Sequence, residues 1–398
     1  MKSNSQNNKS TAVLDQTTDT PGVTSNKPAA PLPLWSYFPI NATIGDIPYV
    51  PSLSTPVAAL SAGELLQLYC LDHENSIFLL ESQGNGPWSA QDLTGETDQF
   101  AQALTNIAAV IIGNGQQRVY YLSPDNRIHE LRFDGQWKDQ EIHDTDGRPI
   151  AAAAHSPLVA FTINGLPKVY FVSTGNHVQE LDFVDGKGWV NNDVTDQARQ
   201  NDRDTPDAQP LSSLTGFAIS DTDKQLPRVY FVSDANQVWE LAWNNGWHSR
   251  QVSDQPPAQG QTSLAGMTVK GDPRIYYIGE GNSVHQARYD AVADRWINSD
   301  LSAETPQKQR AAAHSPLACV NFGSTPRVYY VGNDASVHEI DLRSAGPVDL
   351  NLTSLTGNKF AAGLTPLTAT VHNGSLHVIY SSLVANVTGL AQFFSQQP

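Results

Sequence analysis

A short strand-like segment recurs along the chain at nearly constant intervals, and this repetition constrains the fold more than any other feature. Weaker copies at Gln67 and His377 flank five strong copies, and the seven copies start at positions 67, 118, 168, 228, 274, 327 and 377. Short strands repeating about every 40–50 residues are the signature of a β-propeller. We therefore expect an all-β fold, a seven-bladed β-propeller. The strong copies are Arg118-Val119-Tyr120-Tyr121, Lys168-Val169-Tyr170-Phe171, Arg228-Val229-Tyr230-Phe231, Arg274-Ile275-Tyr276-Tyr277 and Arg327-Val328-Tyr329-Tyr330.

Each repeat has room for four strands. In the second copy we expect them over 106–112, 118–122, 127–133 and 137–142, separated by turn residues of the hairpin type such as Asp134-Gly135. The blades should therefore be four-stranded antiparallel sheets. Alternation of side chains along a strand places Val119 and Tyr121 on one face, and Arg118 and Tyr120 on the other.

The last copy lacks space for its fourth strand, because the chain ends at Pro398, soon after the copy begins at His377. The interval from Trp35 to Gln67 nearly equals the interval from Trp88 to Arg118. This spacing predicts that Trp35-Ser36-Tyr37-Phe38 supplies the outer strand of the last blade, so that the N-terminal strand closes the ring. We expect the propeller over residues 31–398, and a disordered tail over the polar, aperiodic residues 1–30.

Charge and hydropathy limit the classes of partner. The net charge of −16 disfavours nucleic acids and anionic membrane surfaces, which attract basic patches, and fits a neutral or cationic ligand. No apolar run approaches membrane-spanning length, and no apolar segment of a signal peptide follows Met1. We expect a soluble protein without membrane insertion, cytoplasmic or released without a conventional signal peptide.

The chemistry repeats together with the strands. The strong copies carry an acidic or amide residue 12 positions after their start, and four repeats carry a tryptophan seven to ten residues later. A basic residue and a carboxylate on neighbouring strands form either an inter-strand salt bridge or a set of charged donors and acceptors for a polyhydroxylated ligand. The tryptophans either pack between strands or stack on the C–H face of a sugar. These residues are Glu130, Glu180, Glu240, Gln286 and Glu339, and Trp137, Trp189, Trp247 and Trp296.

The stretch from Arg118 to Glu130, repeated five times at fixed spacing, resembles the repeat of the fucose-binding β-propeller lectins. That family includes the fungal Aleuria-type lectins and seven-bladed bacterial relatives. The resemblance implies a multivalent, non-catalytic lectin that binds L-fucose or fucosylated glycans between adjacent blades, without a cofactor or metal. Its implied partners are fucosylated glycans or glycoproteins on cell surfaces, and homo-oligomer formation stays open.

The resemblance also implies the residues of each sugar site, with the basic and acidic residues from one blade and aromatic residues from the next. The implied sets are Arg118 and Glu130 with Phe183 and Trp189; Lys168 and Glu180 with Trp243 and Trp247; Arg228 and Glu240 with Tyr289 and Trp296; and Arg327 and Glu339 with Trp35. Lysine lacks the planar fork of arginine, which weakens the second set. Three copies depart from the pattern. The copy with Arg274 and Gln286 has no carboxylate, and the next repeat has Pro347-Val348 where a tryptophan belongs. The copies with Gln67 and Leu79, and with His377 and Gly389, have lost the pair.

Two other functions are compatible with a propeller. A glycoside hydrolase would have one central site with unique carboxylates, whereas the acidic residues here recur at the periphery. A protein-interaction scaffold of the common types would carry WD or kelch signatures, which the sequence lacks. The position before the repeated acid varies (His129, His285 and His338, but Gln179, Trp239 and Phe78), which favours an edge position over a metal ligand. The acidic insert with Asp202, Asp204 and Asp207 is interpreted as a solvated loop rather than a calcium site.

Overall fold

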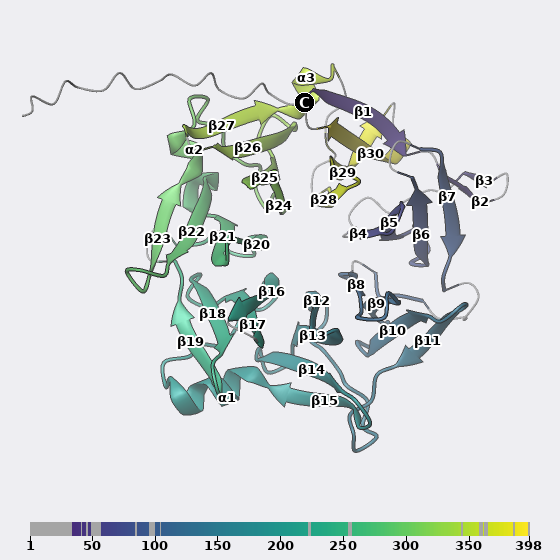
Figure 1. The fold of residues 1–398 in the computed structure, drawn as a ribbon, viewed down its shortest axis with the longest axis vertical. Coiled ribbons are helices and arrows are strands. Elements are labelled where there is room, and N and C mark those ends of the chain that lie inside the picture. Colours follow the sequence, from purple (N-terminus) through teal and green to yellow (C-terminus); the bar gives the residue numbers. More distant parts are fainter. Residues whose placement is uncertain are drawn as a thin grey trace, which may run out of the picture. The chain divides into compact units, whose positions relative to one another are not determined.

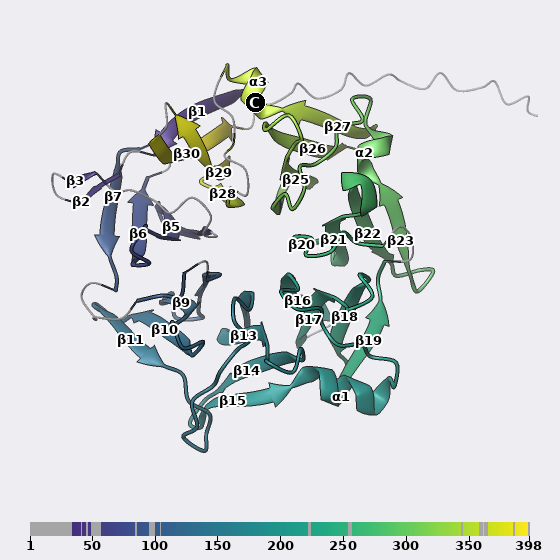
Figure 2. The same ribbon diagram turned by 180° about the vertical axis from the view of Figure 1, so that it is seen from behind.

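The strands of the computed structural model form seven separate β-sheets, which follow one another around a ring within the unit from Pro33 to Gln397 (Figures 1 and 2). The structure describes residues 34–40, 42–44, 47–48, 57–83, 86–94, 100–103, 105–221, 224–253, 257–343, 345–357, 361, 365–384 and 387–396. The tail expected over residues 1–30 lies outside this range. The predicted seven-bladed propeller is confirmed.

Five consecutive blades are four-stranded antiparallel sheets in chain order. Blade 2 contains β8 (Ala108–Ile111), β9 (Gln117–Leu122), β10 (Ile128–Phe133) and β11 (Trp137–Glu141), and blade 3 contains β12 (Leu158–Ile163), β13 (Leu166–Val172), β14 (Val178–Val184) and β15 (Gly188–Asp193). Blade 4 contains β16 (Leu214–Asp221), β17 (Lys224–Val232), β18 (Val238–Trp243) and β19 (Trp247–Gln251). Blade 5 contains β20 (Leu264–Val269), β21 (Asp272–Ile278), β22 (Val284–Asp290) and β23 (Arg295–Asp300), and blade 6 contains β24 (Leu317–Phe322), β25 (Thr325–Val331), β26 (Val337–Arg343) and β27 (Gly346–Asn351).

The chain closes the ring as its spacing predicted. Blade 7 joins β28 (Leu367–His372), β29 (Ser375–Val384) and β30 (Val387–Gln396) to the N-terminal strand β1 (Trp35–Ile40), with Trp35 opposite Ser395. Blade 1 differs from the expected four strands. Besides β4 (Ala58–Ala62), β5 (Leu65–Leu71), β6 (Ile77–Ser82) and β7 (Trp88–Asp92), it includes β2 (Ala42–Ile44), which runs parallel to β7, and β3 (Ile47–Pro48).

Constant hairpins explain why the repeat spacing is so regular. The turn between the second and third strands places an asparagine eight residues after the repeat start, and its φ is positive at Asn75, Asn126, Asn176, Asn236 and Asn282. Asparagine tolerates this left-handed conformation better than other residues with a side chain. The turn fixes the register, so that the repeated acid lies opposite the tyrosine of the preceding strand, as Glu130 lies opposite Tyr120.

The hydrophobic core lies between blades rather than inside one. Seven apolar clusters each combine side chains of two neighbouring blades, including a cluster that joins Ile379 of blade 7 to Leu66 of blade 1. Alternation separates the two faces of β9 as predicted, because Val119 and Tyr121 pack toward blade 1 and Tyr120 packs toward blade 3. Burying apolar area in this way is the main stabilising contribution to such a fold.

Short helices connect some of the blades. They are α1 (Val194–Asn201), α2 (Leu301–Glu304) and α3 (Leu352–Leu355), whereas the 3₁₀ turn η1 (Glu280–Asn282) lies in the hairpin between β21 and β22 of blade 5. The first three begin after a capping side chain that accepts a backbone N–H, at Asp193, Asp300 and Asn351. None of the helices among the described residues combines the length and apolarity that crossing a bilayer requires.

Candidate functional site

In four blades the predicted basic and acidic residues meet as ion pairs. The Nε atom of Arg118 lies 3.4 Å from Oε1 of Glu130, and Nζ of Lys168 lies 2.9 Å from Oε1 of Glu180. Arg228 Nη1 lies 3.1 Å from Glu240 Oε1, and Arg327 pairs directly with Glu339. The fixed hairpin register explains these contacts, since it brings the basic residue of the second strand diagonally next to the acid of the third.

A tyrosine holds each of these carboxylates from within the blade. The hydroxyls of Tyr120, Tyr170, Tyr230 and Tyr329 donate to the glutamates at 3.0, 2.7, 2.8 and 2.7 Å. Burial, followed by the neighbouring carboxylate, raises the pKa of these tyrosines well above the usual value, so they remain donors. Sequence analysis missed this role, although the tyrosine stands two residues after every strong repeat start.

Each predicted tryptophan comes from the next blade and packs edge-on against that tyrosine. Ring centroids are separated by 5.9 Å for Trp189 and Tyr120, 6.2 Å for Trp247 and Tyr170, 6.0 Å for Trp296 and Tyr230, and 6.5 Å for Trp35 and Tyr329. The first three tryptophans are at most 8 % exposed. They therefore form the floor beneath the ion pair and belong to the inter-blade core.

A second aromatic ring lies opposite each of these three tryptophans on the preceding strand. Phe183, Trp243 and Tyr289 pair with Trp189, Trp247 and Trp296 across the ladder, with ring centroids 5.3, 5.8 and 5.6 Å apart. Trp243 is 37 % exposed, whereas Trp247 is 1 % exposed. In blade 4 the two positions differ by burial, because Trp247 packs in the core and Trp243 presents its ring to solvent, whereas Phe183 and Tyr289 are half-buried against the core.

Blades 3 and 4 enclose a cleft with a volume of about 450 Å³. This volume lies within the range of about 300–1,000 Å³ that is usual for small-ligand sites. Lys168, Glu180, Trp243 and Trp247 all line the cleft, so the structure brings this predicted set together in one cavity. Lys168 also contacts Asp182 at 3.0 Å, and Asn192 donates to Glu180 at 3.1 Å. The remaining lining includes apolar side chains from two first-to-second strand hairpins, Ile163, Leu226 and Pro227.

Blades 4 and 5 form a second cleft around Arg228 and Glu240. One cavity of about 280 Å³ is lined by this pair and Tyr289, and another of about 310 Å³ adjoins the same pair on the side of blade 4. The guanidinium of Arg250 lies 5.2 Å above the Tyr289 ring, and Tyr289 donates to Asp294. Trp296 does not line either cavity, which agrees with its burial in the core.

The Arg118 and Arg327 pairs are more enclosed. The side chains of Arg118 and Glu130 are 13 % and 8 % exposed, and burial raises the pKa of Glu130 against the opposing effect of Arg118. Glu339 is fully buried, and burial raises its pKa to about 7 although Arg327 stabilises the carboxylate. Arg327 also lies 3.4 Å from Asp341.

The three divergent copies contain substitute contacts. Arg274 donates to Gln286 at 3.3 Å, and Pro347 occupies the register position of the tryptophan in the next blade, as the sequence predicted. Gln67 and Leu79 do not form the repeated pair, but Gln67 donates to Glu81, two residues beyond Leu79, at 2.6 Å. In blade 7, His377 stands at the start of the repeat, and its ring nitrogen Nδ1 contacts the side-chain amide of Gln392. The constant repeat interval did not find this partner because the β29–β30 hairpin is longer.

One group among the described residues has the composition of a metal site. His177, Asp193 and Asp196 place ligand atoms within 4.8 Å of one another. Arg199, however, lies 3.1 Å from the other ring nitrogen of His177 and pairs with Asp207. A guanidinium in this position already compensates the carboxylates and repels a cation, so we do not assign a metal to the group. Asp207, expected in a solvated loop, instead forms part of this network.

Comparison with known proteins identifies similar chains. A family model described as fungal fucose-specific lectin matches residues 105–342, more than half of the chain. The fucose-specific lectin of Aspergillus fumigatus is 25 % identical over 243 residues, which cover 59 % of this chain and 73 % of that protein. Among solved structures, the BP39L lectin of Burkholderia pseudomallei has a TM-score of 0.60 at 14 % identity and covers 88 % of this chain and 99 % of its own. The SapL1 lectin, solved in complex with alpha methyl fucoside, has a TM-score of 0.54 at 21 % identity, with 76 % and 96 % coverage.

Proposed function

Because the chain belongs to the family of fungal fucose-specific lectins, we propose that it binds L-fucose and fucosylated glycans in clefts between neighbouring blades. The observation that supports this most strongly is the cleft between blades 3 and 4. It combines a cation, a carboxylate and an exposed indole at Lys168, Glu180 and Trp243 within one cavity. These three groups are what a sugar ring with adjacent hydroxyls and an apolar face requires.

Each group has a separate part in holding the sugar. The ammonium of Lys168 donates to sugar hydroxyls, and Glu180 accepts from them with the lone pairs that Tyr170 and Asn192 leave open. The indole of Trp243 supplies a flat apolar surface for ring C–H groups. At C6, L-fucose carries a methyl group where galactose has a hydroxymethyl group, and the apolar side chains of Ile163 and Leu226 give this methyl group a compatible surface.

The function proposed here is binding without catalysis. The family is one of non-enzymatic carbohydrate-binding proteins. A glycoside hydrolase needs one carboxyl group that is protonated at the scissile bond. Glu339, whose pKa is raised to about 7, is the carboxyl nearest to that requirement, but Arg327 and Tyr329 occupy its two oxygens inside the protein.

Several clefts on one ring provide multivalent attachment. A single sugar in one cleft makes one set of charge-assisted hydrogen bonds and stacks on one aromatic ring. We therefore expect a free monosaccharide to bind weakly, with a dissociation constant that is roughly micromolar to millimolar. Simultaneous occupation of several clefts by a surface with many fucosylated chains raises the overall affinity without any new contact. Fucosylated glycans or glycoproteins on cell surfaces are therefore the proposed partners.

A glycan array with matched pairs tests the proposal directly. Each pair consists of a fucosylated glycan and the same glycan without fucose. We expect retention on the fucosylated members only, and competition by free L-fucose. The conservative variant Glu180→Gln should weaken retention, since it removes the charge but keeps the size of the side chain. Equal retention on both members of every pair would contradict the proposed function.

A further inference from the structure

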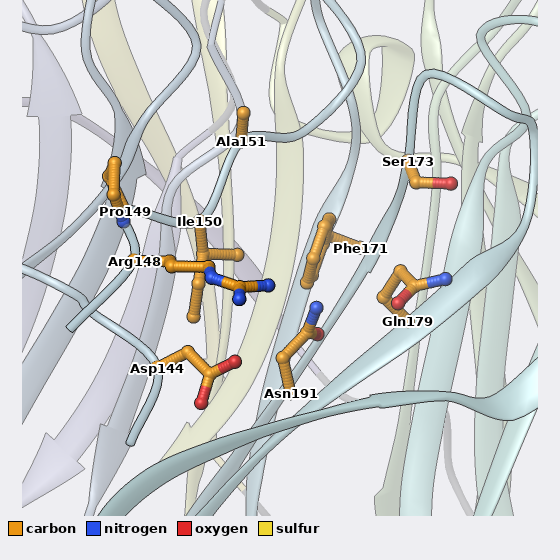
Figure 3. Close-up of a pocket in the computed structure, with 9 residues that line it drawn as sticks. All are labelled: Asp144, Arg148, Pro149, Ile150, Ala151, Phe171, Ser173, Gln179 and Asn191. Carbon is orange, nitrogen blue, oxygen red and sulfur yellow. The ribbon is translucent and has the colours of Figure 1, made fainter. Parts of the chain in front are cut away.

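A polar cleft of about 300 Å³ opens between blades 2 and 3, away from the Arg118–Glu130 pair of the same interface. Arg118 stands near the start of the second strand of its blade, β9. The cleft is lined instead by Ser173, which follows the end of β13, and by the connection from blade 2 to blade 3. It therefore lies at the opposite end of the blades, on the side of the inter-blade connections. Figure 3 shows Arg148 reaching from this connection toward Phe171 and Asn191.

In two other blades the equivalent positions are filled by a closed cluster of tyrosine, histidine and aspartate. In blade 2 the hydroxyl of Tyr121 donates to Asp139 at 2.7 Å, and Nδ1 of His129 lies 2.9 Å from the same carboxylate. Blade 6 repeats this arrangement with Tyr330, His338 and Asp349, where the His338 contact is 2.7 Å. The tyrosine and histidine rings pack against each other in both blades. In both clusters the aspartate satisfies the tyrosine hydroxyl and Nδ1 of the histidine.

Blade 3 carries a different set of residues at the same positions. The strand registers place Phe171, Gln179 and Asn191 where blade 2 has Tyr121, His129 and Asp139. Phenylalanine removes the hydroxyl, and the two amides replace the imidazole and the carboxylate. Gln179 is 6 % exposed, and its side chain makes no hydrogen bond to any of the residues that the structure describes. The amide of Gln179 lines the cleft, so both its donor and its acceptor are available to a ligand that enters there.

The opposite wall of the cleft supplies one carboxylate and one guanidinium. A tight turn holds Asp144 and Arg148 together, with hydrogen bonds from Asp144 N to Arg148 O at 2.9 Å and from Gly147 N to Asp144 O at 2.8 Å. A hydrogen bond from the Thr145 hydroxyl lowers the pKa of Asp144, which keeps its carboxylate ionised and accepting. The two charges on this wall compensate each other, so the cleft favours neither an anion nor a cation.

From these groups we propose that the cleft binds one neutral polyhydroxylated ring, a single pyranose unit, independently of the sites at the Arg–Glu pairs. Hydroxyl groups both donate and accept, and they match a lining in which two amides do both, a guanidinium donates and a carboxylate accepts. The volume is at the lower end of the range for ligand sites, which limits the occupant to about one ring. Phe171 forms part of the lining and offers an aromatic surface for ring C–H groups.

Closing the cleft with the cluster of blade 2 gives the most specific test. The triple variant Phe171→Tyr, Gln179→His and Asn191→Asp installs residues that already pack at these positions elsewhere in the protein. A second variant, Arg148→Ala, removes an exposed side chain and leaves the blade unchanged. Arg203→Ala is the matched control, because Arg203 is also exposed and lies on the next inter-blade connection. Glu130→Ala separates the cleft from the Arg118 pair of the same interface.

The probes are methyl pyranosides of several hexoses, myo-inositol and, as a zwitterion, glycine, measured with the full chain by saturation-transfer NMR. We expect at least one neutral ring compound to bind in the cleft, and its affinity should fall about tenfold or more in Arg148→Ala. This binding should be absent from the triple variant. Arg203→Ala and Glu130→Ala should retain it. The proposal is overturned if no neutral ring compound shows binding that these variants weaken, or if only glycine shows it.

Discussion

Replacing Trp243 and Trp247 one at a time should separate sugar binding from stability. The two rings are neighbours across a ladder, 5.8 Å apart, yet Trp243 is 37 % exposed in the cleft and Trp247 is 1 % exposed in the inter-blade core. Trp243→Ala removes the surface on which a sugar stacks. Trp247→Ala removes a ring that packs against Tyr170 and neighbouring core residues.

The expected magnitudes follow from these environments. An aromatic stacking contact contributes about 0.5–1.5 kcal/mol, so Trp243→Ala should weaken fucose binding at this cleft about two- to thirteenfold. Its effect on the free energy of unfolding should stay below about 1 kcal/mol. Removing a fully buried tryptophan costs about 3–5 kcal/mol. For Trp247→Ala this is a large part of the whole stability of about 5–15 kcal/mol that is typical of a domain.

Calorimetric titration with methyl α-L-fucoside and urea unfolding followed by circular dichroism provide the two readouts. Trp243→Ala should weaken one class of sites with little change in the unfolding midpoint, and Trp247→Ala should lower that midpoint. Trp247→Phe serves where the alanine variant does not fold. The reasoning is refuted if Trp243→Ala leaves the binding isotherm unchanged, or if Trp247→Ala has no effect on unfolding.

Three further predictions concern single side chains. Burial raises the pKa of Glu339 to about 7 in the folded chain, so the unfolded chain releases this proton first as the pH rises. The stability of the wild type relative to Glu339→Gln should therefore fall by about 3 kcal/mol between about pH 4.5 and pH 7 and then level off. A pH-independent difference in urea unfolding would argue against this. Lys168→Arg should strengthen fucose binding at its cleft by about 1 kcal/mol, because a planar fork can donate two parallel hydrogen bonds, and calorimetry showing no gain would count against the assigned contact. Ser156→Ala should cost about 1–3 kcal/mol of unfolding free energy, because it leaves the buried N–H of Val172 without its acceptor at 2.8 Å; Ser315→Ala, at the equivalent place in blade 6, should cost the same.

Much of the fold could be predicted because one structural unit repeats with constant hairpins. The asparagine turn fixes the register between the second and third strands, so the same interval that leads from Arg118 to Glu130 finds the acid in other blades. The same regularity located Trp35 in the last blade. The interval fails where a hairpin changes length, as in blade 7, and where the acid has moved by two residues to Glu81.

The parts of the candidate site that escaped prediction depend on contacts between blades. Trp243 and Trp247 have the same residue type, and only the packing of blade 3 against blade 4 makes one of them core and the other surface. Strands β2 and β3 extend blade 1, where β2 pairs with β7 and with β3. The repeat pattern did not predict this pairing. The cleft at Gln179 depends on a connection that belongs to no repeated strand.

The central claim is that the repeated pairs of a basic residue and a glutamate hold fucose. Calorimetric titration of the full chain with L-fucose tests it most directly, because it counts sites. We expect more than one site per wild-type chain, and a number that falls stepwise in Glu130→Ala, Glu180→Ala and Glu240→Ala while circular dichroism shows that the fold survives. A triple variant that keeps the full number of sites and the full affinity would show that these pairs are only structural.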